Sequence, residues 1–339
     1  MLVNTAQLQT ALEIVKPGLA SKEVIEQATS FAFMNGRVIT YNDEISISHP
    51  VDGIDFEGAL KADKLYALLK KTKKEEIDIS LVKNEVIITG GKSKAGLALQ
   101  AEITLPLEEV SQRGKWKPLP ENFIKFIGFA MPSCSKDMSR PVLTCVHVSK
   151  QGFIESCDNF SITKCTLPEE LPFEDFLLSA TSAVHVVKLN PNKLAEGKGW
   201  IHFKNEAGTV ISCRIYEEKY PDISQFLFSK GNKVILPQTI ESVLDRADIF
   251  SGGDHILDGS VTISIGENRL KIEARTDDGW YKEEVNLKYD FDPITFSITP
   301  YLLKRILSES AACLISKDKL KFEGEGWLYL TMLRHTKEE

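Results

Sequence analysis

The chain lacks the long apolar runs of membrane proteins. None of its stretches approaches the roughly 20 consecutive apolar residues that a bilayer-spanning helix needs. Its opening residues, 1–5, also lack the basic and apolar regions of a secretory signal. From these absences we expect a cytoplasmic protein that makes no membrane contact.

Cysteine is absent from the first third of the chain. The six cysteines are Cys134, Cys145, Cys157, Cys165, Cys213 and Cys313. Their positions fit neither the framework of a disulfide-stapled domain nor the paired spacing of a zinc site. We expect all six to be reduced thiols with structural roles.

Catalytic motifs are missing as well. The six histidines stand singly, without a partner three or four residues away. Gly91-Lys92-Ser93 resembles the end of a phosphate-binding loop, but Val86 stands where that loop needs its first glycine. The sequence therefore predicts no catalytic residue, no metal ion and no cofactor. An enzyme acting on nucleic acid remains an alternative, and it would need clusters of carboxylates to bind metal ions. The close pairs of aspartates are at 277–278 and at 290 and 292. Both pairs lie beside expected turns, where solvated acids are normal.

Positive charge is not in excess, since the formal net charge is −7. This total argues against a protein coated in nucleic acid. It does not exclude one that keeps its cations on a single surface, because phosphate contact depends on the local potential. With 42% hydrophobic and 26% charged residues, the composition is that of an ordinary globular protein.

What the chain does have is a repeat of domain size. Amphipathic helices open near Gln7, Phe123 and Ile240, and a second set opens near Ala62, Ala180 and Thr299. The register is about 116 to 119 residues, which is the size of a domain rather than of a solenoid unit. We predict three tandem copies, at residues 1–115, 116–231 and 232–339.

Each copy is expected to run helix, strands, helix, strands. In the first copy we expect helices near 8–15 and 62–70 and strands at 31–33, 37–41, 44–48, 77–81, 85–89 and 97–105. In the second we expect helices at 123–129 and 180–189 and strands at 142–148, 153–157 and 200–215. In the third we expect helices at 240–247 and 301–307 and strands at 261–265, 269–272, 320–322 and 327–333. Polar linkers are expected at 108–114 and 228–233, and the fold class is α+β with antiparallel hairpins over two helices.

Four stretches carry a family resemblance. They are 139–143 running into a hairpin, 157–162 on its second strand, 220–223 closing the middle copy, and 329–334 at the end. Together and in this order the chain resembles the bacterial β sliding clamp of DNA polymerase III over essentially its whole length. The resemblance implies three DNA-clamp domains per chain, each with two helices packed on antiparallel sheets, and a ring of two chains around duplex DNA. It implies a homodimer whose partners are double-stranded DNA, the DNA polymerase, the clamp loader and other clamp-binding peptides.

Basic residues near the expected helices are the DNA-binding candidates, because mobile contacts to phosphates carry no sequence information. They are Lys64, Lys70, Lys71, Lys73, Lys74, Lys125, Lys188, Lys193, Arg246, Lys304 and Arg305, with Lys22 and Lys136 added by the resemblance. The lysines between positions 70 and 74 have an alternative role, since cations at a helix C-terminus complement its dipole.

The resemblance also implies a cleft for a hydrophobic partner peptide. The matching positions are Arg140, Leu143, Cys157, Asn159, Phe160, Ile162, Phe228, Leu330 and Met332. Aliphatic and methionine walls suit such a peptide, although Leu143, Ile162 and Leu330 could equally be ordinary core. Asn159, Phe160 and Ser161 replace the family's usual glycine and basic residues, so we expect a narrower, less polar cleft.

The dimer interface has candidates in the first and third copies. They are Leu99, Ala101 and Ile103 on the expected strand 97–105, and Ile249, Phe250 and Trp280. An exposed Ile249-Phe250 pair would be an unusual apolar patch for a monomer, whereas a buried pair would need no partner. Two assemblies therefore stay open: a weak dimer that opens easily, and a monomer that closes only on DNA. A clamp-like, peptide-binding hub that does not close stably around DNA is a separate alternative.

Overall fold

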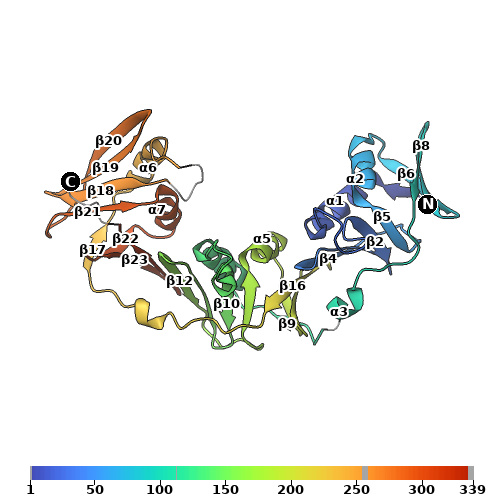
Figure 1. Cartoon of the computed structure of the whole chain (residues 1–339), viewed down its shortest axis with the longest axis horizontal. Helices are drawn as coiled ribbons and strands as arrows, with labels where there is room; N and C mark the ends of the chain where they lie inside the picture. Colours follow the sequence, from blue (N-terminus) through green and yellow to red (C-terminus); the bar gives the residue numbers. More distant parts are fainter. Residues whose placement is uncertain (1, 112, 254–258, 335–339) are drawn as a thin grey trace. The chain divides into compact units, whose positions relative to one another are not determined.

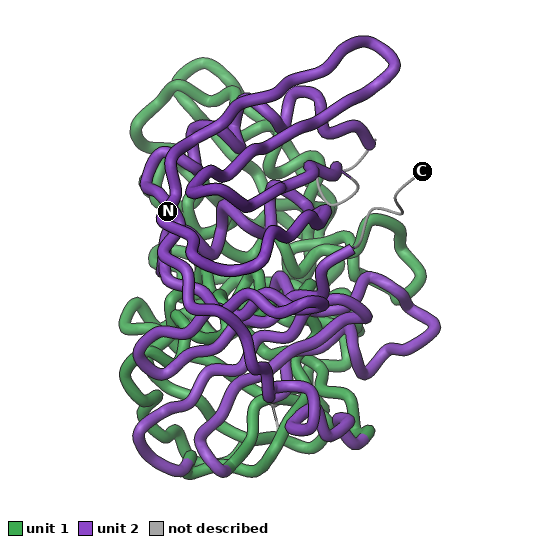
Figure 2. Tube along the Cα trace, turned by 90° about the vertical axis from the view of Figure 1, so that its left-hand side faces the viewer, with its two compact units in different colours: residues 1–131, 148–150, 171–218 green, residues 132–147, 151–170, 219–339 purple. Residues whose placement is uncertain are grey.

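The computed structural model describes residues 2–111, 113–253 and 259–334 (Figure 1). The chain forms two compact units (Figure 2). Unit 1 comprises residues 1–131, 148–150 and 171–218, and unit 2 comprises 132–147, 151–170 and 219–339. Both units take residues from the expected middle copy, so the boundaries of three domains stay a prediction. Within the described part of the chain, no helix is long and apolar enough to cross a membrane.

The six helices expected from periodicity are confirmed and form three contacting pairs. The pairs are α1 (Thr5–Val15) with α2 (Ala62–Lys71), α4 (Phe123–Ala130) with α5 (Ala180–Leu189), and α6 (Ile240–Asp248) with α7 (Pro300–Leu307). The first helix begins where the Asn4 side chain accepts a hydrogen bond from the Gln7 amide, an N-cap that satisfies one otherwise unpaired donor. Each helix buries one apolar stripe, for example Leu8, Leu12 and Val15 in α1.

Unit 1 holds two antiparallel sheets. The smaller runs β1 (Leu2–Asn4), β6 (Glu76–Val82), β7 (Glu85–Gly90), β8 (Ser93–Ala98). The larger runs β13 (Phe176–Ser179), β16 (Val210–Tyr216), β4 (Ile45–Pro50), β3 (Arg37–Tyr41), β2 (Ser30–Met34), β5 (Gly58–Lys61), with β15 (Trp200–Lys204), β14 (Lys193–Gly197) and β9 (Lys117–Pro118) beside β16. Because β16 pairs with β4, strands of the first and second expected copies share one sheet.

Unit 2 also holds two antiparallel sheets. One runs β17 (Asn232–Ile235), β22 (Ala312–Ile315), β23 (Lys319–Gly324), β24 (Trp327–Met332), β12 (Ser161–Thr166), β11 (Phe153–Cys157). The other runs β20 (Gly279–Asn286), β19 (Arg269–Thr276), β18 (Val261–Gly266), β21 (Ile294–Ile298). Glu267 and Asn268 both have positive φ, 50° and 60°, which is the backbone of a tight hairpin turn between β18 and β19. Strand β10 (Cys145–Ser149) includes residues of both units.

The cores follow from the alternation of these strands. In unit 1, Phe123 of α4 meets Phe173 edge to face at 5.9 Å, and the contact continues through Phe176 to Phe203 of β15. On another face of unit 1, Tyr41 and Trp200 are buried together with Leu105 and Val110. The segment 103–110 is therefore packed onto the sheet.

This packing corrects two sequence expectations. The last strand of the first copy, expected at 97–105, is β8 at Ser93–Ala98. After β8, Leu99 is buried, and Ile103 packs on the buried cluster of Tyr41, Trp200, Leu105 and Val110, here called the Tyr41 cluster. These contacts explain why apolar residues alternate there. Between residues 99 and 105, only Gln100 makes a β-bridge, to Ala59. The expected linker 108–114 begins with a short helix, α3 (Leu107–Ser111), because Val110 is an anchor in the same cluster.

Two further expectations change in unit 2. Residues 142–144, expected as strand, belong to a 3-10 turn, η3 (Pro141–Thr144), because Pro141 lacks an amide donor and sets the first turn. Residues 157–162, expected on one strand, are the end of β11, a turn, and the start of β12. Further single turns are η1 (Lys16–Gly18), η2 (Met131–Ser133) and η4 (Ser224–Phe226).

Candidate functional site

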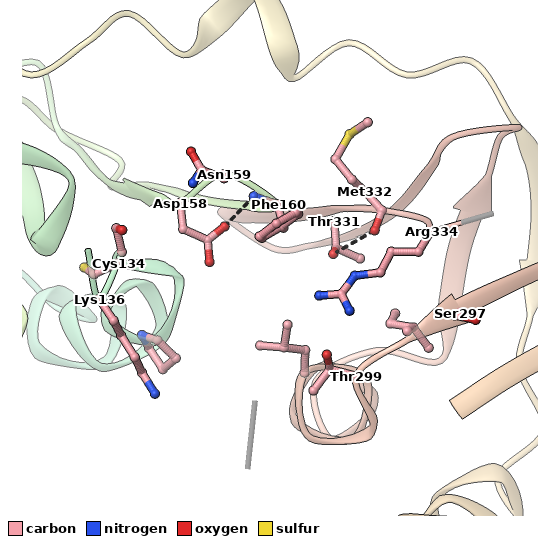
Figure 3. Close-up of a pocket in the computed structure, with 14 residues that line it drawn as sticks. Cys134, Lys136, Asp158, Asn159, Phe160, Ser297, Thr299, Thr331, Met332 and Arg334 are labelled. Carbon is pink, nitrogen blue, oxygen red and sulfur yellow. Dashed lines mark hydrogen bonds between the residues drawn. The ribbon is translucent and has the colours of Figure 1, made fainter. Parts of the chain in front are cut away.

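A pocket of about 260 Å³ lies within unit 2 (Figure 3). Four segments line it: the chain after η2, the turn between β11 and β12, the junction of β21 with α7, and the end of β24. The lining residues are Pro132, Cys134, Ser135, Lys136, Asp158, Asn159, Phe160, Ser297, Ile298, Thr299, Leu302, Thr331, Met332 and Arg334. Its volume lies just below that of typical drug-sized sites, so it suits one or two side chains.

The β11–β12 turn places Phe160 at the pocket. Asp158 Oδ1 accepts hydrogen bonds from the amides of Phe160 (2.7 Å) and Ser161 (2.6 Å), which closes an Asx turn. The Phe160 carbonyl accepts the Met332 amide at 2.7 Å, so the turn is joined to the end of β24. Phe160 is 52% exposed and Met332 38%, so two large apolar side chains are presented to solvent.

The opposite wall carries a cation above the start of a helix. Arg334 is fixed by a β-bridge to Ser297, and its guanidinium lies 5.3 Å from the centre of the Phe160 ring. Figure 3 shows this guanidinium extending over the space between Phe160 and Thr299. The side chain of Thr299 makes no capping hydrogen bond to α7.

Behind the turn, Tyr220 holds the end of β11. Its hydroxyl accepts the Cys157 amide at 2.8 Å and lies 3.4 Å from the Cys157 Sγ. The ring of His147 stacks on Tyr220 with centroids 4.9 Å apart. Burial raises the pKa of the Cys134 and Cys157 thiols, so neither is a reactive thiolate at neutral pH.

Three of the nine predicted cleft residues line this pocket: Asn159, Phe160 and Met332. Cys157, Ile162 and Leu330 are buried. Ile162 of β12 lies directly opposite Leu330 of β24. Both Ile162 and Leu330 are therefore core residues, which was the alternative given for them from the sequence. Arg140, Leu143 and Phe228 do not line it. A peptide-binding role for any of the nine stays a prediction.

The basic candidates of unit 1 lie on its surface. Those exposed are Lys22, Lys64, Lys70, Lys71, Lys73, Lys74, Lys125, Lys188 and Lys193. Lys70 and Lys71 form the last turn of α2, which keeps the helix-dipole role open. Lys193, expected near the end of a helix, lies on β14, because α5 ends at Leu189.

Three of the four basic candidates of unit 2 are engaged by acids or half-buried. Arg246 pairs with Glu283 (2.7 Å), and Lys304 pairs with Asp245 (3.0 Å) and Asp248 (3.1 Å). Burial lowers the pKa of the half-buried Arg305. Lys136 is exposed and lines the pocket described above.

The interface candidates divide into exposed and packed residues. Ile249 is 75% exposed and Trp280 64%, while Phe250 stacks on Tyr281 with centroids 6.4 Å apart. Among the described strands, β8 is one of the two edge strands of its sheet, with β1 at the other edge, and β20 is one of the two edge strands of its sheet, with β21 at the other edge. Ala101 is exposed, and Leu99 and Ile103 pack inward as described above.

Eleven of the fourteen lining residues were not among the predicted cleft residues, and they include Ser297, Thr299, Leu302 and Arg334. Arg334 ends the stretch 329–334 that carried the resemblance, and Thr299 opens a helix that periodicity found, so both were near a signal. No pattern in the sequence, however, predicts that β21 and β24 converge. In the described part of the chain, no group of three or more His, Cys, Asp and Glu side chains could hold a metal ion.

Comparisons with known proteins give matches of structure only. No family model matches the sequence, and no curated protein does. The chain is similar to the DNA polymerase III beta chain from Streptococcus pneumoniae TIGR4, with 19% identity, 99% of each chain covered and a TM-score of 0.83. It is similar to the beta subunit from DNA polymerase of Streptococcus pyogenes, with 19% identity, 99% of each chain covered and a TM-score of 0.82. It is also similar to the DNA polymerase sliding clamp from Bacillus subtilis, with 16% identity, coverage of 99% and 98%, and a TM-score of 0.82. The chain therefore has the fold of these beta subunits.

Proposed function

We propose that this protein is a DNA sliding clamp, a processivity factor that encircles duplex DNA and tethers a replicative polymerase. The observation that carries the proposal is the likeness of fold to solved beta subunits over 99% of both chains. A match of that extent covers all three helix pairs, and these are the elements that would face DNA in a ring. No catalytic residue or cofactor is needed for tethering.

In this proposal the exposed lysines of unit 1 contact phosphates without reading bases. Lys70, Lys71, Lys73 and Lys74 place four cations within five residues at the end of α2. Long, solvated side chains give weak and exchangeable contacts, so the protein can slide. The chain as a whole is acidic, which would limit binding to DNA outside the ring.

The pocket of unit 2 is proposed as the site that tethers partners. A peptide from the polymerase, the clamp loader or another partner would place an apolar side chain against Phe160, Leu302 and Met332. These three side chains supply burial, while the surrounding Ser, Thr and Asn side chains fix the peptide backbone.

Ring closure is proposed to use the outer strands β8 and β20 of two chains. An unpaired outer strand invites pairing with another chain, and a closed ring would hide both edges. Ile249 and Trp280, exposed near the β20 edge, would be covered in such a dimer.

A second function is kept because of the ion pairs in unit 2. Arg246 and Lys304 are engaged by Glu283, Asp245 and Asp248, so this unit offers DNA less positive charge than unit 1. A hub that binds partner peptides without closing stably on DNA would need no positive inner surface there.

Salt resistance separates these two functions. The full chain is incubated with linear duplex DNA, and the DNA is then ligated into circles in its presence. A ring trapped on a circle should stay bound at about 1 M NaCl, where electrostatic contacts are screened, and an open binder should be released. The matched control is the same DNA left unligated; equal loss from both samples would contradict the clamp proposal.

A further inference from the structure

Strand register sorts the charges at one edge of the larger sheet of unit 1 onto its two faces. Lys193 of β14 lies directly opposite Lys204 of β15 and Pro118 of β9, so these residues share a face. Lys117 and Glu196, which form an ion pair at 2.9 Å, occupy the alternate positions and point to the other face. In these three strands, the face of Lys193 therefore carries cations and no carboxylate.

The same face holds an indole ring beside two cations. The guanidinium of Arg113 lies 5.5 Å from the centre of the Trp116 ring, and the Nζ of Lys204 lies 5.8 Å from it. Arg113 and Lys193 are exposed, and Trp116 is half-buried. Among the described residues, no acidic side chain forms an ion pair with any of the three cations. We call Arg113, Trp116, Lys193 and Lys204 the Trp116 patch.

The Trp116 patch lies on the side of the sheet away from α1. One row of residues in register crosses from β15 to β3, and its members are Phe203, Ile211, Ile47 and Thr40. The Thr40 hydroxyl donates a hydrogen bond to the Val15 carbonyl of α1 at 2.6 Å, so this row lies on the helix side. Lys204 follows Phe203 on its strand and therefore points away from α1. In the proposed clamp the helices face the enclosed duplex, so the patch is a separate surface.

The chemistry that fits this patch combines flat rings with phosphates. Nucleobases stack on aromatic side chains, and lysine and arginine contact the backbone that joins them. In a duplex the bases are already paired and stacked inside the helix, so only a single strand can place a base against the Trp116 ring. An acidic peptide would satisfy the cations but would leave the indole unused.

We propose that the Trp116 patch binds single-stranded nucleic acid, with one base stacked on Trp116 and the neighbouring phosphates beside Arg113, Lys193 and Lys204. The attraction is local, because the chain as a whole has a formal net charge of −7. The inference goes beyond the proposed clamp function and does not depend on ring closure.

The test measures binding of a labelled oligothymidylate to the full chain by fluorescence anisotropy. The probe has about 12 nucleotides, within the usual range of single-strand sites. A duplex of the same length, made with oligoadenylate, is the second probe. Log affinity for the single strand should fall with log salt with a slope of about 2, as expected if three phosphates are neutralised.

Variants of the patch should weaken the single strand and spare the duplex. Trp116→Leu keeps an apolar side chain but removes the aromatic ring, and it should lower the affinity for the single strand about tenfold. Trp116→Phe should retain part of that affinity, because a smaller ring still stacks. Arg113→Gln with Lys204→Gln should reduce the salt slope by about 1.4. The duplex, which binds on the helix side in the proposed function, should bind these variants as it binds the wild type.

The matched control is Lys117→Gln. Lys117 neighbours Trp116 in the chain but points to the other face, where it pairs with Glu196. Its replacement should leave the affinity for the single strand unchanged. A second measurement needs no variant: an oligonucleotide that carries 5-bromouracil, irradiated on the wild-type chain, should crosslink to Trp116, as identified by mass spectrometry.

Three results would overturn the inference. The first is a Trp116→Leu protein that binds the single strand as tightly as the wild type does. The second is a bromouracil crosslink confined to residues outside the patch, which would hold even if Trp116→Leu failed to fold. The third is displacement of the oligothymidylate by an equal concentration of a polyglutamate peptide, because the patch would then recognise negative charge alone.

Discussion

At the scale of single residues, Met332 and Leu302 supply, with Phe160, the apolar part of the pocket. Met332→Ala combined with Leu302→Ala should weaken binding of a labelled, capped Gly-Phe-Asn-Leu-Gly peptide by about tenfold or more, because each truncation removes apolar contact worth about 1 kcal/mol. Anisotropy titration measures the change.

The matched control for this pair is Met138→Ala. Met138 is a 66% exposed methionine that does not line the pocket. Its truncation should leave the affinity as it is. Loss of affinity in the control, or no loss in the double variant, would contradict the assignment of the pocket walls.

A second residue-scale prediction concerns His202, which is fully buried on β15. Its Nδ1 lies 2.8 Å from Ser212 Oγ, and in the described part of the chain its Nε2 has no hydrogen-bond partner. Burial first, and then the charge of Arg113, lowers its pKa from 6.5 to about 4. Between these values the unfolded chain binds a proton that the folded chain does not, so stability is complete above pH 6.5 and is lost as pH falls towards 4.

The size of this effect follows from the shift. His202 should contribute about 3 kcal/mol to the fall in unfolding free energy between pH 6.5 and pH 4. Denaturation of the wild type and of His202→Asn across this range measures it. The variant should show a shallower dependence on pH, and an identical slope in both proteins would refute the prediction.

At the scale of elements, Tyr220 links the connector after β16 to the end of β11. Tyr220→Phe leaves the buried Cys157 amide without its acceptor, which should cost about 1–3 kcal/mol. Hydrogen exchange at the Cys157 amide should accelerate about tenfold or more. The control is Tyr66→Phe, whose hydroxyl bonds the exposed Glu13 at 3.0 Å, and which should change stability little. Unchanged protection of Cys157 would show that Tyr220 does not hold the turn.

The lysines at the end of α2 allow another element-scale prediction. Lys70→Gln with Lys71→Gln should lower the slope of log affinity for linear duplex DNA against log salt by about two, if each lysine meets one phosphate. Filter binding over a salt series measures the slope. If the two lysines serve only the helix dipole, the slope will stay the same and α2 will lose stability instead.

The sequence predicted elements best where one local period dominates. The helices α1, α5 and α7 were predicted within a few residues because their apolar stripes repeat every three or four residues. Residues 99–105 were wrongly predicted as strand, since β8 ends at Ala98. Their apolar alternation has a tertiary cause, because Leu99 is buried and Ile103 packs on the Tyr41 cluster. The pocket was only partly predictable. Phe160 and Met332 lie in stretches that carried the family resemblance. Leu302 and Arg334 join them only through tertiary contacts, the pairing of β12 with β24 and the bridge between Arg334 and Ser297 of β21.

At the scale of the whole molecule, the proposed function requires closure of two chains into a ring. Trp280 and Ile249 are the exposed apolar residues proposed to be covered by the second chain. Trp280→Asp with Ile249→Asp should convert the protein into a monomer of 37.9 kDa, because two buried charges would oppose association. Sedimentation at several concentrations measures the mass, and Phe291→Asp, at a 44% exposed aromatic residue outside the proposed interface, is the control. A wild-type protein that is monomeric at every concentration would leave the hub function in place of the clamp.

The most direct measurement follows the protein on a circular DNA that is then cut. Protein trapped on ligated circles is washed at high salt, and its mass per DNA is measured by light scattering before and after a single restriction cut. A sliding clamp should be retained as two chains per ring, close to twice 37.9 kDa, and should leave the DNA once the ends are free. Retention that does not depend on cutting, or no retention on intact circles, would contradict the central claim that this chain encircles DNA.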